Sequence, residues 1–195
     1  MITYAFVSRF QRMQVSARSL FSLTRASWRE TLVLMVVAWL VPFLVHLVPW
    51  SGPRPLGVHM LPAFWTAFVA VYLYGGGVGV LVALVVPVVN TLTTGLPVSD
   101  RVLAMSVELI AYVALAALAV RRWPSLRLVA PLAWLPAYAL SLGGQWAVPT
   151  FGYARDPIAH FGGTLANVWP GLVVLFVVNT VLVRLLPKDA DWDAE

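Results

Sequence analysis

The sequence predicts an all-α, multi-pass membrane protein, and two observations carry that prediction. Hydrophobic residues make up 61% of the 195 residues, charged residues only 11%, and the mean hydropathy is +0.85. Soluble domains are far less apolar than this. The apolar residues also form continuous runs that are long enough to cross a hydrocarbon core roughly 30 Å thick as helices. A membrane β-barrel would instead show short segments of alternating hydrophobicity.

Residues 1–30 form a basic segment in which arginines alternate with apolar side chains. Two interpretations are open. The segment is either an amphipathic helix at the membrane surface, with its arginines against anionic headgroups, or a loosely ordered basic tail that only orients the first span. It lacks the apolar core and cleavage site of a signal peptide, so we expect it to stay on the protein. The arginines are Arg9, Arg12, Arg18, Arg25 and Arg29.

Residues 31–187 form the predicted transmembrane domain, a bundle of six helices, and an acidic tail follows at 188–195. The second span is short enough to be tilted or partly re-entrant. Each boundary is a hydropathy boundary, placed where the apolar run starts or stops. The predicted spans are 31–48, 59–74, 78–94, 102–120, 126–147 and 164–186.

Basic residues predict the orientation of these spans. With the N-terminus in the cytoplasm, ten Lys and Arg residues fall on the inner side and only Arg54, Arg101 and Arg155 on the outer side. Cytoplasmic loops are enriched in Lys and Arg, so this asymmetry favours both termini inside.

In this orientation the polar residues gather toward the outer ends of the spans. The stretch 75–112 shows this best, because two apolar runs in it become polar at Asn90, Thr94 and Glu108. Polar side chains inside apolar spans are costly and need a partner or a ligand, so we expect an outward-facing pocket. The candidate ligand-binding residues are His46, His59, Trp65, Asn90, Thr94, Glu108, Tyr112, Gln145, His160 and Asn167.

Glu108 is the one acid well inside a predicted span. It either binds donor groups of a ligand, carries a proton, or pairs with Arg101 or Tyr112. Arg101 shares its helix face but lies roughly 10 Å away along the axis, which disfavours a direct ion pair. A ligand-binding or structural hydrogen bond is favoured over proton transport, since a proton relay needs more than one buried ionisable group.

All three histidines fall on the outer side, where neutral imidazole can ligate a transition metal or the cobalt of a cofactor. The alternative for each is an interfacial histidine bonded to backbone or lipid. The chain has no cysteine, which excludes thiolate metal sites.

Gly75, Gly79 and Ala83 place a small residue at every fourth position, which lets another helix approach closely. The partner is either a helix of this chain or another subunit, and packing inside the chain is the simpler interpretation. Enzyme motifs such as HExxH, a Walker sequence or G-x-S-x-G do not occur, and no pair of carboxylates stands out, so we do not expect an enzyme. The basic charge follows membrane topology and not a nucleic-acid groove.

Three stretches carry a resemblance to a known family. They read VPFLVHLVP over 41–49, HMLPAFWTAFVAVYLYGGGVGVLVALVVPVVNTLTTGLP over 59–97, and ELIAYVALAALAVRR over 108–122. This text resembles the substrate-binding S components of energy-coupling factor (ECF) transporters, which take up vitamins and related micronutrients. The matching features are His46, His59 with Pro62, the glycines of 75–79, the pattern over 87–97, and Glu108 with Tyr112.

The resemblance implies a bacterial cytoplasmic-membrane protein with six helices and an outward-facing pocket that loops close. It also implies coupling to a transmembrane T component and two ATPase subunits, through small residues in span one. Ala38 is the candidate docking residue there, but Pro42 stands where the family has a second alanine, which leaves a solitary vitamin transporter open. The position of the histidines makes cobalamin or another corrinoid the first substrate expected, with His46, His59 or His160 as axial ligand to cobalt. The alternatives from other classes are a structural envelope protein of the rod-shape-determining MreD type and a membrane-embedded enzyme.

Overall fold

The computed structural model describes residues 28–52, 54–98, 101–148 and 156–188. Every regular element in this part of the chain is helical, as the hydropathy predicts. Predictions for the N-terminal segment 1–27, for Arg155 and for the tail 189–195 lie outside the described residues. The helices are α2 (Trp28–Leu47), α3 (Leu56–Met60), α4 (Pro62–Tyr74), α5 (Gly76–Thr94), α6 (Val102–Arg122), α7 (Val129–Ala147) and α8 (Pro157–Leu185).

Five segments within the described residues are long and apolar enough to cross a membrane: α2, α3 with α4, α5, α6 and α8. The chain is therefore a multi-pass helical membrane protein. Helix α7 has 19 residues, as many as α5, but it is less apolar because it contains Pro131, Pro136, Gln145 and a Gly-Gly pair. The five-helix count differs from the expected six at this helix alone.

The second predicted span is two helices and not one. Leu61 adopts a left-handed conformation (φ 53°) between α3 and α4, and Pro62 follows it as the first residue of α4. Because proline has no backbone N–H and restricts the residue before it, the chain breaks there and restarts. The predicted span 59–74 is thus interrupted at Leu61, although Leu56–Tyr74 as a whole is long and apolar enough to cross a membrane.

The sixth predicted span begins too late. Helix α8 begins at Pro157 and not at residue 164, because Asp156 caps it. The Asp156 carboxylate accepts hydrogen bonds from the backbone N–H groups of Ile158 and Ala159, both at 3.0 Å. An Asp-Pro pair is a typical helix start, with the acid at the cap and proline in the first turn. His160 is consequently inside α8 and not in the loop before it.

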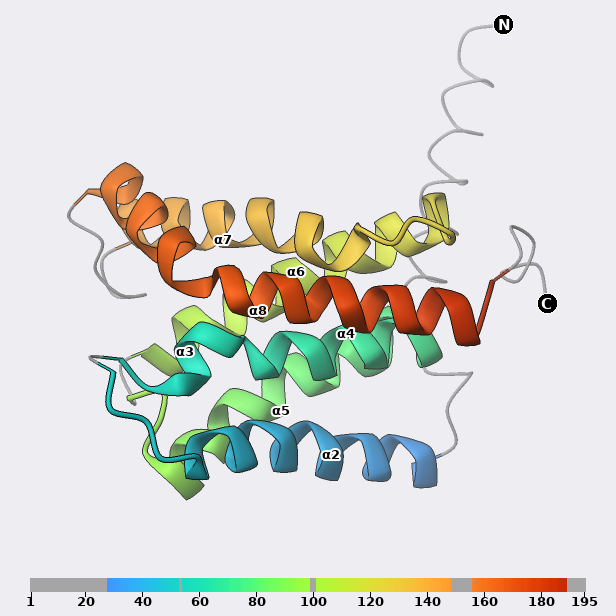
Figure 1. Ribbon diagram of the computed structural model, residues 1–195, viewed down its shortest axis with the longest axis horizontal. Coiled ribbons are helices and arrows are strands. Elements are labelled where there is room, and N and C mark those ends of the chain that lie inside the picture. Colours follow the sequence, from blue (N-terminus) through green and yellow to red (C-terminus); the bar gives the residue numbers. More distant parts are fainter. Residues whose placement is uncertain (1–27, 53, 99–100, 149–155, 189–195) are drawn as a thin grey trace, which may run out of the picture.

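The helices lie side by side along one long direction, with α2 and α7 on opposite sides of the bundle (Figure 1). Helix α4 packs against α2, α5, α6 and α8, and it contributes many of the buried residues. The C-terminal ends of α2, α5 and α7 meet the N-terminal ends of α3, α6 and α8 at the left of Figure 1. We call this the cavity end. The N-terminal end of α2 and the C-terminal end of α8 lie at the opposite end, which we call the far end.

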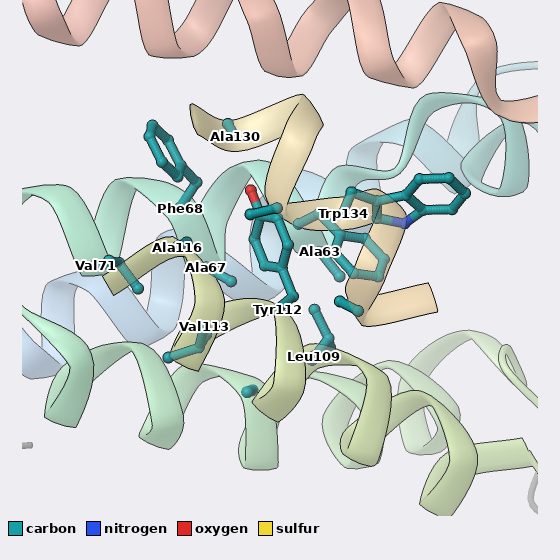
Figure 2. Packing of buried hydrophobic residues seen from close by; sticks show 14 of the residues in the cluster. Ala63, Ala67, Phe68, Val71, Leu109, Tyr112, Val113, Ala116, Ala130 and Trp134 are labelled. Atoms are coloured by element: carbon teal, nitrogen blue, oxygen red, sulfur yellow. The ribbon is translucent and has the colours of Figure 1, made fainter. Parts of the chain in front are cut away.

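Small residues allow the central helices to approach closely. A Cβ atom on Gly79 would lie 2.6 Å from a methyl carbon of Val71 on α4 and 2.9 Å from one of Val113 on α6. Ala83 is also buried in this cluster, whose centre Figure 2 shows around Tyr112 and Val113. The stripe begins at Gly75, in the turn between α4 and α5 with φ 90°, where a side chain would strain the backbone.

Three of the four candidate docking positions are covered by this chain's own helices. Gly79, Ala83 and Ala38 are buried within the chain, so of the two interpretations of the small residues, the structure supports packing inside the chain. The exposed side of α2 consists instead of Leu, Val and Trp side chains.

Candidate ligand-binding site

A cavity of about 290 Å³ opens at the cavity end, among α2, α3, α4, α5, α6, α7 and α8. This volume is that of roughly ten water molecules at about 30 Å³ each. Five of the ten predicted ligand-binding residues line it, each from a different stretch of the chain. They are His46, Asn90, Glu108, Gln145 and His160.

Glu108 lies in the wall that α6 contributes. Arg101, Ala104 and Met105 line the cavity from the same helix, at the spacing of one helix face. No ion pair joins Arg101 to Glu108 in the structure, in agreement with their axial separation of roughly 10 Å. Glu108 is thus a partly exposed carboxyl group facing a cavity, without a cation paired to it among the described residues.

Trp134 on α7 is the described residue that comes closest to donating a hydrogen bond to Glu108. Its indole N–H is close enough to act on the Glu108 carboxyl as a donor. The geometry does not reach that of a hydrogen bond, and the buried indole nitrogen has no other partner among the described residues. Hydrogen bonds weaken steeply with poor alignment. This N–H therefore orients Glu108 electrostatically at most.

Asn90 presents a second unsatisfied polar group to the cavity. Its side chain is 3% exposed, and its Oδ1 atom has no hydrogen-bond partner among the described residues. Thr94 uses the backbone carbonyl of Asn90 instead, with its hydroxyl donating at 2.8 Å. A buried acceptor without a partner costs free energy, and a ligand donor in the cavity would remove that cost.

His46 stands where the cavity meets a second one of about 580 Å³, formed by the end of α2, the loop to α3 and the end of α5. Its Nδ1–H donates to the carbonyl oxygen of Pro42 at 2.6 Å. In the neutral ring this leaves Nε2 as a hydrogen-bond acceptor. A Cβ on Gly57 would lie 2.7 Å from Nε2, so α3 packs directly against the imidazole.

The opening of the cavity is basic. Arg101 at the start of α6 is exposed and lines it, and His160 lines it from the first turns of α8. Arg54 lines the neighbouring cavity. The charged groups thus lie at different depths: the Glu108 carboxyl group is inside the cavity, and Arg101 and Arg54 are nearer the solvent.

The hydropathy pattern did not predict that the aromatic side chains of Trp134 and Tyr138 on α7 form one wall of the cavity. The rings of Trp134 and Tyr138 stack at 4.9 Å between centroids and 10° between planes. The Tyr138 hydroxyl donates to Oγ1 of Thr164 at 2.8 Å, which ties α7 to α8. Trp134, Tyr138, Ser141 and Gln145 recur every three or four residues, and this helical periodicity was the signal that could have identified the wall.

Two predicted site residues support the cavity from outside it. His59 donates from Nδ1 to the backbone carbonyl of Asn167 at 2.8 Å and thereby ties α3 to α8. Asn167 contributes that carbonyl only, because its side-chain amide donates to Gly163 within its own helix. Neither side chain lines the cavity, so their prediction as ligand contacts is not supported by the geometry.

Three further predicted residues also lie elsewhere. Tyr112 is buried in the core, edge-on to Phe64 at 5.1 Å, and its hydroxyl points toward α7 (Figure 2). Trp65 packs against the same core from α4, and neither residue lines the cavity. Thr94 lines the second cavity and closes the end of α5, where its hydroxyl accepts from the N–H of Leu96 at 3.2 Å. As ligand contacts these three residues stay predictions, and none of them lines the cavity of about 290 Å³.

The expected corrinoid stays a prediction, because one axial histidine would be enough to bind its cobalt. Within the described residues no three His, Asp or Glu side chains form a group that could hold a free metal ion. His59 is turned to α8, which leaves His46 and His160 as the histidines that line the cavity. A cavity of about 290 Å³ accommodates a small organic molecule or one part of a larger one.

Comparison with known proteins gives no relative: no family model matches the chain, and neither a curated protein nor a solved structure is significantly similar to it.

Proposed function

We propose that this protein is a membrane-embedded binding subunit for the uptake of a small micronutrient, of the same kind as the S components that its sequence resembles. One observation carries the proposal. At one end of an apolar bundle, a cavity of about 290 Å³ brings together Glu108, which has no cation paired to it among the described residues, and Asn90, whose Oδ1 is buried there without a hydrogen-bond partner. Polar groups at membrane depth are retained where they bind something.

The distribution of charge supports an outward-facing cavity. Among the described residues, Arg101 and Arg54 line the two cavities at the cavity end. The other described basic residues stand at or beyond the helix ends that face the far end: Arg29 at the start of α2, Arg121 and Arg122 at the end of α6, Arg127 before α7, and Arg184 and Lys188 at and after the end of α8. Because cytoplasmic ends are enriched in basic residues, we place the far end and both termini in the cytoplasm. In this proposal α7 counts as the sixth span, shielded from lipid in part by α6 and α8, and the membrane is the bacterial cytoplasmic membrane.

The substrate in this proposal is a molecule that the cavity holds whole or in part, and the energising partner is left open. Ala38 is buried and Pro42 lines the cavity, so the small residues of α2 give no surface for a T component. A solitary transporter and an ECF-dependent subunit are both compatible with this part of the geometry.

Native mass spectrometry of the purified protein tests the proposal directly. We expect a small molecule to remain bound to the wild-type protein and to be lost from Ala104→Phe, because Ala104 lines the cavity one turn from Glu108. Ala139→Phe is the matched control, since Ala139 is exposed on α7 and the same substitution there leaves the cavity intact.

Glu108→Gln is a second variant, which keeps the side-chain shape and thus separates loss of binding from misfolding. Retention of the ligand by both Ala104→Phe and Glu108→Gln would show that it binds elsewhere. A wild-type protein without any small molecule, even after incubation with a cell extract, would favour a structural envelope protein.

A further inference from the structure

We infer that the ligand has a planar, cationic head rich in N–H donors, bound between Glu108 and Asn90, and an acidic tail that reaches Arg101. The inference rests on the proposed function and specifies the substrate class for the same cavity. It follows from which hydrogen-bonding groups the chain leaves unused, where they lie, and what surrounds them.

The inner part of the cavity offers acceptors. Oδ1 of Asn90 is buried without a partner, and the Glu108 carboxyl faces the same space. His46 adds a third acceptor, because its Nδ1–H is used by Pro42 and Nε2 is left over. A ligand that satisfies these acceptors must supply hydrogen-bond donors, and one acceptor on it can meet the unpaired indole N–H of Trp134 in the same lining.

A cationic donor would stabilise Glu108 in its ionised form. A carboxylate in an apolar segment needs a cation or several donors beside it. The described residues supply neither, since Arg101 lies about two turns of α6 away. An amidinium, a guanidinium or a protonated aminoheterocycle provides the charge and presents paired N–H groups to the carboxylate, in the geometry that makes such contacts strong.

The shape of the head follows from the aromatic walls. Trp134 and Tyr138 stack on each other along α7, and Phe64 lines the cavity from α4. A flat ring packs well against such faces, and a cation near them gains an additional attraction. The volume of about 290 Å³ is enough for a ring with small substituents.

The acidic tail of the ligand is inferred from the charge at the opening of the cavity. Arg101 is exposed there, and it lies roughly 10 Å nearer to the solvent than Glu108. A carboxylate or phosphate on the distal side of the ring would meet the guanidinium as the head meets Glu108. The cationic head of the ligand then meets Glu108 in the inner part of the cavity, and its acidic tail meets Arg101 at the opening.

Isosteric probes test this class in the purified protein in lipid nanodiscs. Benzamidine, benzamide and benzoate share one shape and differ in charge and donors, and para-carboxybenzamidine adds an acidic tail. We expect calorimetry to give benzamidine about tenfold or more tighter binding than benzoate, with benzamide between them, because donors to a charged acceptor contribute most. The added carboxylate should tighten binding by a further factor of about three to ten.

Single-residue variants test which residue contacts which group of the probes. Glu108→Gln should weaken benzamidine about tenfold and leave benzamide nearly unchanged, whereas Arg101→Gln should remove only the advantage of para-carboxybenzamidine. Arg122→Gln at the exposed far end is the charge-matched control and should change nothing.

Benzoate binding as well as or better than benzamidine would overturn the inference and leave the proposed function intact. The same holds if no probe binds while native mass spectrometry still detects a bound molecule. If neither experiment detects binding, the proposed function fails together with the inference.

Discussion

Each end of the bundle buries an asparagine side chain, but the two side chains differ in whether their hydrogen bonds are satisfied. Asn179, near the far end, is 0% exposed, and both halves of its amide are used: Oδ1 accepts from the N–H of Ala130 at 2.9 Å, and Nδ2 donates to the carbonyl of Leu126 at 3.1 Å. Asn90, at the cavity end, is almost as buried, but its Oδ1 has no partner among the described residues. One asparagine holds the start of α7, and the other faces a cavity.

A buried polar group that is bonded within the chain contributes to stability, whereas one without a partner is a candidate for binding a ligand. At the far end the hydroxyl of Tyr72 also finds a backbone partner, the carbonyl of Leu186 at 2.8 Å. Such bonds contribute to stability and leave nothing for a ligand. At the cavity end Oδ1 of Asn90 has no such partner among the described residues, and so it is available for binding.

Replacing each asparagine by leucine gives the largest expected contrast. Asn179→Leu leaves the N–H of Ala130 and the carbonyl of Leu126 buried without partners, and we expect a loss of about 3 kcal/mol of unfolding free energy. Asn90→Leu removes an acceptor that is already unpaired and should change stability by less than about 0.5 kcal/mol. Unfolding in mixed detergent micelles measures both. Equal losses at the two positions would contradict the distinction between the ends.

The cavity end should depend on close backbone contact more than on polar side chains. A Cβ on Gly171 would lie 2.7 Å from the carbonyl oxygen of His59 and 2.8 Å from Cγ of Leu61. Gly171→Ala should therefore cost about 2 kcal/mol, because α8 has to move away from the break between α3 and α4. Gly163→Ala in the same helix meets nothing within 4 Å and should be neutral or slightly stabilising in the same unfolding assay. A neutral Gly171→Ala would show that this contact does not hold the cavity end.

Gly57→Ala should have the smallest effect on stability and a clear effect on binding. The new methyl group displaces the flexible His46 ring, from whose Cε1 atom it would lie 2.5 Å, so we expect less than about 1 kcal/mol of destabilisation. The displaced ring no longer presents Nε2 to the cavity, and ligand affinity should fall about fivefold to tenfold. Titration of the ligand identified by mass spectrometry measures this loss. Gly143→Ala, with open space around its Cβ, should leave affinity unchanged.

Hydropathy alone predicted the fold class and the bounds of most helices to within a few residues. It failed where a local backbone signal overrides hydropathy. Leu61 and Pro62 break a run that is apolar throughout, and Asp156 with Pro157 starts α8 before the apolar run begins. Both signals are readable from the sequence, because proline and a capping acid act within one helical turn.

The depth of a residue in the membrane was likewise determined by the sequence, since counting along a span gives its position on the helix axis. That is why the predicted site residues lie in the same half of the bundle. Which of them share a cavity was decided by tertiary structure alone. Glu108 and Tyr112 stand one turn apart on α6, yet one faces the cavity and the other packs on Phe64. The rotation of each helix follows from how its small and large side chains fit the neighbouring helices, and no single segment contains that information.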